Sequence, residues 1–433
     1  MGVNRRQFLL GGLGLAAAAT TMGLTGCAPG SSDSGGGGGD AGTAELAFTW
    51  WGNEVRNKNT TAAIDAYTAA NPGVKISPQP GEWSSYWDKL ATQVAGNTAP
   101  DVIQMDMAYI AEYGNRGALL DLSGVDTSKF IEGTVDSGKI NDTLYGINAG
   151  FNCLVNLANP KVFDKAGMDV PDDKTWTWDS LIDVSAEVAS KAKVTFGFQG
   201  LVHSNLFEAW IRQQGKTLFT AEGLGYEAAD VQGWFDYLVK AQKAGAIGSP
   251  SQINEEEGKS LDQSAIVLGN AALSLSNSNQ LEAISAAAGT DLNLLRYPTI
   301  AGDAAQRNAW YKASMLWSAS ARTKNPDAVV AFINWLVNTP EAGEKLLAER
   351  GMPANSEVQE AVKPKLSKAQ QTVQQFLIDI KPELGETPIA PPPGGGKTQE
   401  VMFRYSTEVL FGRQSTAEAA QKYVDEMNSN LQG

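Results

Sequence analysis

Histidine and cysteine are nearly absent from this sequence of 433 residues. It contains one histidine, His203, and two cysteines, Cys27 and Cys153. Transition-metal sites in proteins are built mainly from imidazole and thiolate ligands, so this composition argues against a zinc-type site. We therefore predict no bound metal and no cofactor.

Positive charge is also scarce. The chain has 34 lysines and arginines against 48 acidic residues, which gives a formal net charge of −14. The basic residues are spread along the chain without a cluster. Such an acidic protein repels nucleic acid and anionic lipid headgroups. We expect no nucleic-acid partner.

The first 26 residues have the pattern of an export signal. Arg5 and Arg6 precede an apolar run, Phe8 to Leu24, that is too short and glycine-rich for a typical membrane-spanning helix. "NRRQFLL" resembles a twin-arginine signal, although the general export route stays open, and "LTGC" resembles a lipobox. The resemblance implies that residues 1–26 are removed and that acylated Cys27 anchors the protein to the outer face of the cell membrane. The alternative is a buried N-terminal helix.

Residues 27–43 are expected to form a tether between this anchor and the folded protein. Residues 28–42, "APGSSDSGGGGGDAG", offer almost no apolar surface and include five consecutive glycines. Such a segment is a flexible coil with a typical end-to-end distance of roughly 20 Å. The tether provides reach from the lipid surface.

Strand-like and helix-like segments alternate after the tether. "ELAFTWW", "VKISP" and "PDVIQMD" are typical of strands, and they are separated by helical stretches at Thr60 to Ala70 and Ser85 to Ala95. A second alternating set follows between Trp178 and Pro298. Short connections favour mainly parallel sheets covered by helices, and a chain of this length exceeds what one core usually serves. We expect an α/β protein with two lobes.

Seven motifs, taken in order, resemble a known family. They are "NPG", "PDVIQMD", "GALLDL", "LYGI", "NPDAVVAFINWL", "GMPANSEV" and "GRQSTAEAAQ". Their order and spacing are similar, over essentially the whole chain, to the family 1 extracellular solute-binding proteins, the carbohydrate-binding components of ABC importers. The resemblance implies a two-lobed periplasmic-binding-protein type II fold, each lobe a mainly parallel sheet flanked by helices, with the ligand cleft between them.

The resemblance also implies how the chain divides between the lobes. The N-terminal lobe would contain residues 44–150 plus 311–360, and the C-terminal lobe residues 151–310 plus 361–433. The chain would cross between them near Asn148 to Asn152, Asn308 to Tyr311 and Val358 to Pro364.

The implied function is that of a receptor and not of an enzyme. It would capture a mono- or oligosaccharide by lobe closure and deliver it to the permease of an ABC transporter. The permease and its ATPase must be separate chains, because this sequence shows no Walker loop and no transmembrane bundle. We expect a monomer. Two alternatives remain: the same fold binding a polyamine or other small polar solute, and a secreted glycosidase that uses Glu54 and Asp106.

Aromatic and polar residues at predicted strand ends are candidate sugar contacts. Side chains alternate along a strand, so we assign Trp50 to the core and Trp51, with Glu54, to the cleft wall. Asp106 leaves its strand in the same way, and Trp83 and Tyr86 open the next helix. Indole faces stack on sugar C–H groups, while polar side chains bind the hydroxyls. The family's cleft segments add Asn148, Asn152, His203, Trp210, Asn277, Ser278, Trp310, Tyr311 and Arg404.

Each candidate also has a structural interpretation. The tryptophans Trp51, Trp210 and Trp310 are as well suited to a core, and Glu54 and Asp106 to helix caps. If Trp51 lies in the cleft wall, its replacement by alanine keeps thermal stability and weakens sugar binding by about 1 kcal/mol or more.

Overall fold

The computed structural model describes residues 43–220 and 222–432. The predicted export signal, Cys27 and the tether up to residue 42 lie outside the described residues. Among the helices that are described, none is both long and apolar enough to cross a membrane.

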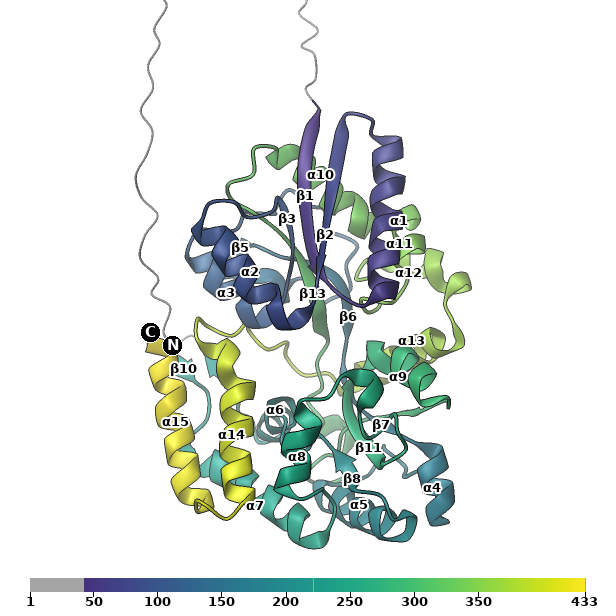
Figure 1. The fold of residues 1–433 in the computed structure, drawn as a ribbon, viewed down its shortest axis with the longest axis vertical. Coiled ribbons are helices and arrows are strands. Elements are labelled where there is room, and N and C mark those ends of the chain that lie inside the picture. Colours follow the sequence, from purple (N-terminus) through teal and green to yellow (C-terminus); the bar gives the residue numbers. More distant parts are fainter. Residues whose placement is uncertain (1–42, 221, 433) are drawn as a thin grey trace, which may run out of the picture. The chain divides into compact units, whose positions relative to one another are not determined.

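The first lobe is built on a five-stranded sheet with strand order β2-β1-β3-β13-β6 (Figure 1). Its strands are β1 (Ala44–Trp51), β2 (Val74–Gly81), β3 (Val102–Met105), β6 (Ile147–Asn152) and β13 (Lys312–Ala319). β1 pairs in parallel with β2 and β3, whereas β13 runs antiparallel to its neighbours β3 and β6. A strand from late in the chain therefore completes the middle of a sheet built from early segments.

Helices cover both faces of this sheet. The helices α1 (Glu54–Ala70), α10 (Pro326–Asn338) and α11 (Pro340–Leu346) pack on the face that carries Phe48 and Trp50. The helices α2 (Trp83–Ala95) and α3 (Met107–Asn115) pack on the face that carries Trp51, and α12 (Ser356–Val362) contacts α11. Each face of the sheet thus has its own core.

The second lobe contains a four-stranded sheet with strand order β12-β7-β11-β8. Its strands are β7 (Leu154–Ala158), β8 (Phe196–Gln199), β11 (Ala271–Asn277) and β12 (Asn293–Leu295). β7 runs antiparallel to β11 and β12, and β8 is parallel to β11. In each of the two sheets all strands but one run in the same direction, so the predicted two-lobed α/β fold is confirmed.

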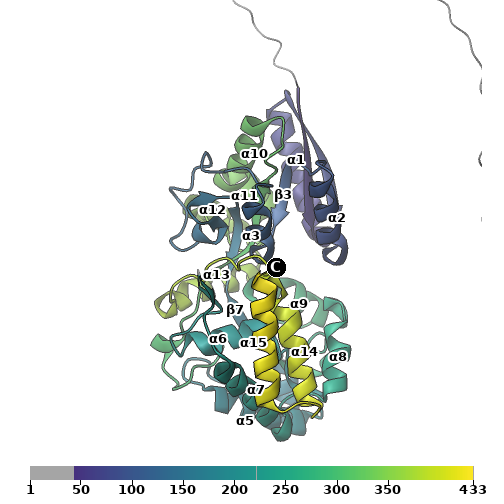
Figure 2. The same cartoon turned by 90° about the vertical axis from the view of Figure 1, so that its left-hand side faces the viewer.

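The helices of the second lobe come from two parts of the chain. They are α4 (Pro160–Ala166), α5 (Trp178–Ala192), α6 (Ser204–Arg212), α7 (Ala228–Ala244), α8 (Pro250–Glu257), α9 (Leu281–Ala288), α13 (Lys368–Ile380), α14 (Thr398–Leu410) and α15 (Thr416–Gln432). The last two lie side by side and pack on α7 (Figure 2). Two short hairpins complete the lobes, β4 (Lys139–Ile140) with β5 (Thr143–Leu144) and β9 (Phe219–Thr220) with β10 (Gly223–Leu224).

The chain passes between the lobes three times. β6 ends at Asn152 in one sheet and β7 begins at Leu154 in the other. The second passage joins β12 to β13, and the third joins α12 to α13, which contacts α9. The lobe boundaries predicted at residues 150, 310 and 360 fall in or next to these passages, and their exact positions stay predictions.

Proline and polar capping residues explain several helix starts. α10 and α11 begin with a proline that follows Asn325 and Thr339, because the first turn does not require the missing N–H. α1 begins at Glu54, six residues before the predicted Thr60, since Asn53 Oδ1 accepts a hydrogen bond from Arg56 N at 2.9 Å.

A buried ion network fixes the segment that leads into β13. The Arg307 side chain is fully buried and donates to Glu383, while Arg296 Nε donates to the other Glu383 oxygen at 2.8 Å. Ala309 N also donates to the Glu383 carbonyl at 3.0 Å, and Gly385 N to the Ala309 carbonyl at 2.8 Å. The network therefore ties the second passage to the segment that follows α13.

Candidate ligand-binding site

A cavity of about 860 Å³ is lined by residues of both lobes. The first lobe contributes the start of α2 and the N-terminal part of α3, and the second lobe contributes α6, β9, the end of α8 and the end of β11. The remaining wall is formed by Trp310 and Lys312 at the second passage and by the segment 388–403, which includes "PPPGGGK". A volume of this size suits a ligand of one to a few sugar rings.

Two aromatic side chains face this cavity from the first lobe. Trp83, the first residue of α2, lines the cavity and is 48% exposed. Tyr109 on α3 also lines it and stacks on Trp87 with ring centroids 3.9 Å apart. Trp51 lies edge-on behind Trp83 at 5.0 Å. The wall therefore exposes Trp83 and Tyr109 and supports them with the buried Trp51 and the half-buried Trp87.

The structure contradicts the cleft-wall assignment of Trp51. Trp50 and Trp51 lie on opposite faces of β1, as predicted, but Trp51 is only 8% exposed and does not line the cavity. The second face of β1 is covered by α2 and α3, so it forms another core rather than a cleft. Tyr86 is buried in that core, where its hydroxyl donates to the Gln104 carbonyl at 2.7 Å. Glu54 is exposed in the first turn of α1 and is likewise absent from the lining.

Asp106 has both of the roles considered from the sequence. Its Oδ1 atom accepts a hydrogen bond from Ala108 N at 2.9 Å and so caps α3. The same side chain lines the cavity, and so does the half-buried Glu112 of α3. Capping uses one carboxylate oxygen, which leaves the other available to a ligand.

His203 and Glu208 line the cavity from the second lobe. His203 caps α6, because its Nδ1 atom accepts a hydrogen bond from Asn205 N at 3.2 Å. Burial, together with the charge of Lys312, lowers the pKa of His203 to about 4. Burial raises the pKa of Glu208 to about 7 against the opposing charges of Arg212 and Lys312. His203 is therefore neutral at pH 7, with its remaining nitrogen available as a donor.

Trp310 and Asn277 also line the cavity from the second lobe and the adjoining passage. Trp310 is buried apart from the surface it gives to the cavity, and the Arg212 guanidinium lies 4.8 Å from its ring centroid. Asn277 ends β11, and its backbone N–H donates to Gln280 Oε1 at 3.2 Å. The structure thus brings together five of the predicted contacts: Trp83, Asp106, His203, Asn277 and Trp310.

Four further predicted contacts are buried near the passages and hydrogen-bond within the protein, so they hold the chain rather than face the cavity. Asn148 donates to the Thr134 carbonyl, Asn152 to Asn279 Oδ1 and Tyr311 to the Leu377 carbonyl, while Ser278 Oγ accepts from Cys153 N.

Trp210 and Arg404 do not line the cavity, although other residues of their helices, α6 and α14, do. Trp210 packs against Phe207 and Trp234 in the second-lobe core. Arg404 forms an ion pair with Glu426 on α15, away from the cavity lining. In both helices a neighbouring residue faces the cavity instead, Glu208 on α6 and Glu400 on α14.

Sequence reasoning missed several lining residues. They include Tyr109, Glu112, Glu208, Phe219, Glu257, Lys312, Gln399 and Glu400. Tyr109 and Glu112 follow Asp106 by three and six positions, a spacing that places them on one helix face, so they were accessible from the sequence. The others depend on how distant helices meet.

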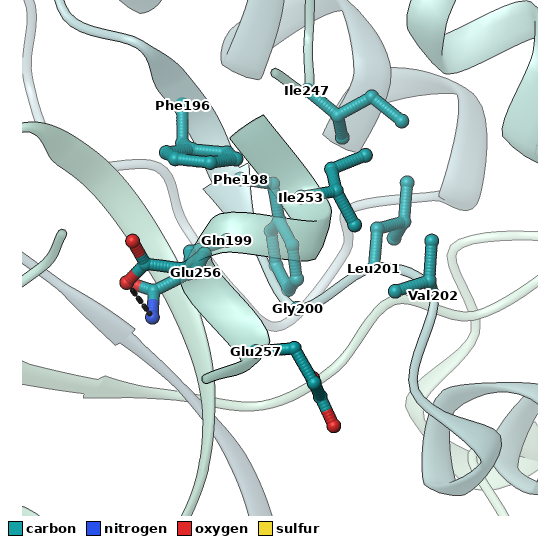
Figure 3. A pocket seen from close by; sticks show the side chains of 10 residues that line it. All are labelled: Phe196, Phe198, Gln199, Gly200, Leu201, Val202, Ile247, Ile253, Glu256 and Glu257. Carbon is teal, nitrogen blue, oxygen red and sulfur yellow. Dashed lines mark hydrogen bonds between the residues drawn. The ribbon is translucent and has the colours of Figure 1, made fainter. Parts of the chain in front are cut away.

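A second, smaller cavity of about 170 Å³ lies within the second lobe (Figure 3). Phe196, Phe198 and Ile253 line it, and its Gln199 side chain is hydrogen-bonded to Glu256 at 3.0 Å. Glu257 points away from the apolar side chains and also lines the larger cavity. With few free polar groups, the smaller cavity is poorly suited to a sugar, and the larger one is the candidate site.

Replacing Glu208 with glutamine should stabilise the protein at pH 8. The folded-state pKa of about 7 lies above the ordinary value of 4.5, so the cost of burying the charge is absent below pH 4.5 and develops as the pH rises through 7. At pH 8 the glutamine variant should gain up to roughly 3 kcal/mol in free energy of unfolding. Urea titration at pH 5 and pH 8 measures this, with the exposed Glu360→Gln as control.

The effect of His203 on the pH dependence of stability should be opposite to that of Glu208. Its folded pKa of about 4 lies below 6.5, so the stability that it contributes is present above pH 6.5 and lost as the pH falls through 4. The Glu208→Gln variant should consequently lose stability on acidification more steeply than the natural protein, and His203→Asn, which keeps a capping side chain, less steeply. Identical slopes in all three proteins would contradict the burial of these groups.

The chain matches known proteins over most of its length. The family model "Bacterial extracellular solute-binding protein" matches residues 51–343. The arabinooligosaccharide-binding protein of Bacillus subtilis is 26% identical over 47% of this chain, and the match spans only about half (47%) of that relative.

Two solved structures are similar over 90% of this chain. The family 1 extracellular solute-binding protein of Alicyclobacillus acidocaldarius has 26% identity and a TM-score of 0.68, with 99% of that chain covered. The periplasmic oligogalacturonide-binding protein of Yersinia enterocolitica, in complex with saturated digalacturonic acid, has 18% identity and a TM-score of 0.78, with 100% covered, a similarity that concerns the fold. Because the family model matches more than half of the sequence, the chain belongs to the bacterial extracellular solute-binding proteins.

Proposed function

We propose that this protein is an extracytoplasmic receptor that captures a saccharide in the cavity between its lobes and delivers it to an ABC permease. The observation that carries the proposal is the composition of the two walls. Trp83 and Tyr109 line the cavity from the first lobe, and Trp310 and Phe219 line it from the side of the second. Aromatic faces on both sides, with carboxylate, amide and imidazole groups at their edges, suit the apolar faces and hydroxyl rim of a sugar.

Ligand binding would favour closure of the lobes. A sugar that touches both walls gains contacts in the closed form that the open form does not offer, and this difference in affinity shifts the equilibrium. The three passages between the lobes are where the backbone would bend. The closed form would then be the one that docks on the permease, whose transmembrane and ATPase subunits are separate chains.

The relatives support a saccharide as the ligand. The similar protein of Bacillus subtilis is named for arabinooligosaccharides, and the Yersinia structure contains a digalacturonic acid. Export agrees with an extracellular family. We further propose that Cys27 carries the lipid anchor, on the basis of the "LTGC" motif and the tether that follows it, and we retain the monomer as an expectation.

A hydrolytic activity is the competing function that one observation favours. Glycosidases need one protonated and one ionised carboxyl group, and Glu208, with its pKa raised to about 7, is a carboxyl of the first kind. The predicted pair of Glu54 and Asp106 is not assembled, because Glu54 does not line the cavity. Incubation with oligosaccharides for several hours should release no new reducing ends, and turnover would contradict the receptor function.

Thermal unfolding in the presence of a saccharide panel tests the proposal. A bound sugar at 100 times its Kd should stabilise the protein by about 2.7 kcal/mol and raise the Tm by several degrees. Solution scattering with the same sugar should show a smaller radius of gyration, because the lobes close. If no mono- or oligosaccharide changed either quantity, the protein would not be a sugar receptor.

A further inference from the structure

The candidate cavity is strongly acidic. Its lining contains five acidic side chains and two lysines, Lys312 and Lys397. The acidic residues are Asp106, Glu112, Glu208, Glu257 and Glu400. Lys312 lies near both His203 and Glu208, and the charge of Lys397 acts on Glu426 outside the lining. The lysines therefore compensate only part of the negative charge.

Glu208 is the most informative of these carboxylates. It is only 8% exposed, and it lines the cavity. Within residues 43–220 and 222–432 its side chain has no ion pair within 4.0 Å and no hydrogen bond. A buried carboxylate without a partner is costly, and a positively charged or hydrogen-donating ligand group would remove that cost.

A second group of carboxylates comes from both lobes and lines the cavity together with one tyrosine. Asp106 and Glu112 lie on α3, Glu400 lies on α14, and all three line the cavity with Tyr109. The pKa of Tyr109 is raised by burial and then by the charges of Asp106, Glu112 and Glu400, which agrees with their shared place in the lining. These like charges from opposite lobes repel each other, and a neutral ligand would leave that repulsion in place.

We propose that the saccharide bound in this cavity carries at least one protonated amine. This inference rests on the proposed function and specifies the chemical class of its ligand. An ammonium group can donate charge-assisted hydrogen bonds to Glu208 or to the carboxylates of Asp106 and Glu400, and it can lie over the faces of Tyr109 and Trp83. By joining carboxylates of both lobes, it would favour the closed form. A saccharide that carries carboxylates would meet repulsion from the same groups.

Matched pairs of neutral and aminated sugars test the inference. Calorimetry would compare glucose with glucosamine, galactose with galactosamine, and cellobiose with chitobiose and its N-acetylated form, at low and high salt. We expect an aminated sugar to bind about tenfold or more tighter than its neutral partner, with an advantage that shrinks as salt rises.

The other outcomes separate the inference from the proposed function. Equal or tighter binding of a neutral or carboxylated sugar would leave the receptor function intact and overturn the amine. Binding of spermidine with no binding of any saccharide at 10 mM would overturn both. Binding of none of these probes would also overturn both.

Carboxylate variants locate the amine. Glu400→Gln and Glu208→Gln should each reduce the affinity for the aminated sugar about fivefold or more relative to that for its neutral partner, because the amide still bonds hydroxyls but carries no charge. Glu408→Gln, on the same helix as Glu400 but outside the cavity lining, is the matched control and should change neither. An unchanged preference for the amine in both cavity variants would overturn this assignment.

Discussion

Trp51→Ala should reduce the free energy of unfolding by about 3–5 kcal/mol, the usual cost of removing a buried indole. Trp51 is 8% exposed and packs against Tyr86 at 5.0 Å, Trp83 at 5.0 Å and Trp87 at 5.5 Å between ring centroids. This expectation is the reverse of the one that the sequence alone suggested, which was stable protein with weakened binding. Thermal and urea unfolding measure the loss directly.

Trp83→Ala is the matched comparison. Its indole is half exposed at the start of α2 and lines the cavity, so little packing is lost when it is removed. The Tm should fall far less than in Trp51→Ala, whereas the Kd for the saccharide should rise about tenfold or more with the loss of a stacking surface. A large loss of stability from Trp83→Ala with unchanged affinity would show that the wall of the site is placed incorrectly.

Glu383→Gln should also cost about 3–5 kcal/mol in stability, because it leaves the buried Arg307 guanidinium without a carboxylate and leaves Arg296 with Asp173 alone. Arg307 is fully buried, Arg296 is 8% exposed, and each donates to one oxygen of Glu383. Since the same segment is paired through its backbone with Ala309, next to Trp310, saccharide affinity should fall as well.

An exposed ion pair provides the control for Glu383. Lys368 and Asp291 lie 2.9 Å apart with side chains 86% and 85% exposed. Asp291→Asn should change the free energy of unfolding by less than about 1 kcal/mol, since exposed pairs contribute little. Similar losses from the two variants would mean that the network around Glu383 is far more hydrated than its burial indicates.

Local sequence signals predicted much of the fold. β1, β2 and β3 overlap the predicted strand segments "ELAFTWW", "VKISP" and "PDVIQMD", and α2 begins two residues before the predicted Ser85 and ends at the predicted Ala95. These elements are determined by periodicity and by short-range capping, which a single sequence displays.

The strands at the first passage were not recognised as strands. β6 and β7 contain asparagines at buried positions, such as Asn152 and Asn156, which interrupt the apolar pattern of a strand. Asn156 is accommodated because its side-chain amide donates to the Arg296 carbonyl at 3.4 Å, a partner distant in sequence. A pattern of neighbours along the chain cannot reveal such a partner.

The site was predicted only in part for a related reason. Alternation along β1 correctly separates Trp50 from Trp51, but it does not show that helices cover both faces of the sheet. Asp106 and Trp83 were accessible because they begin helices directly after strands. Glu208, Glu257 and Glu400 come from three helices of the second lobe, and only the tertiary arrangement brings them to one cavity.

The position of β13 has a consequence for how the newly made protein becomes compact. β13 separates β3 from β6, so neither of those strands has its inner neighbour until residues 312–319 have left the ribosome. Most of the second lobe is synthesised in the meantime, while the open edge of β3 and the unpaired β6 could pair with other chains. Completion of the first lobe should therefore be slow and late, and this interval is when a molecular chaperone would be of most use.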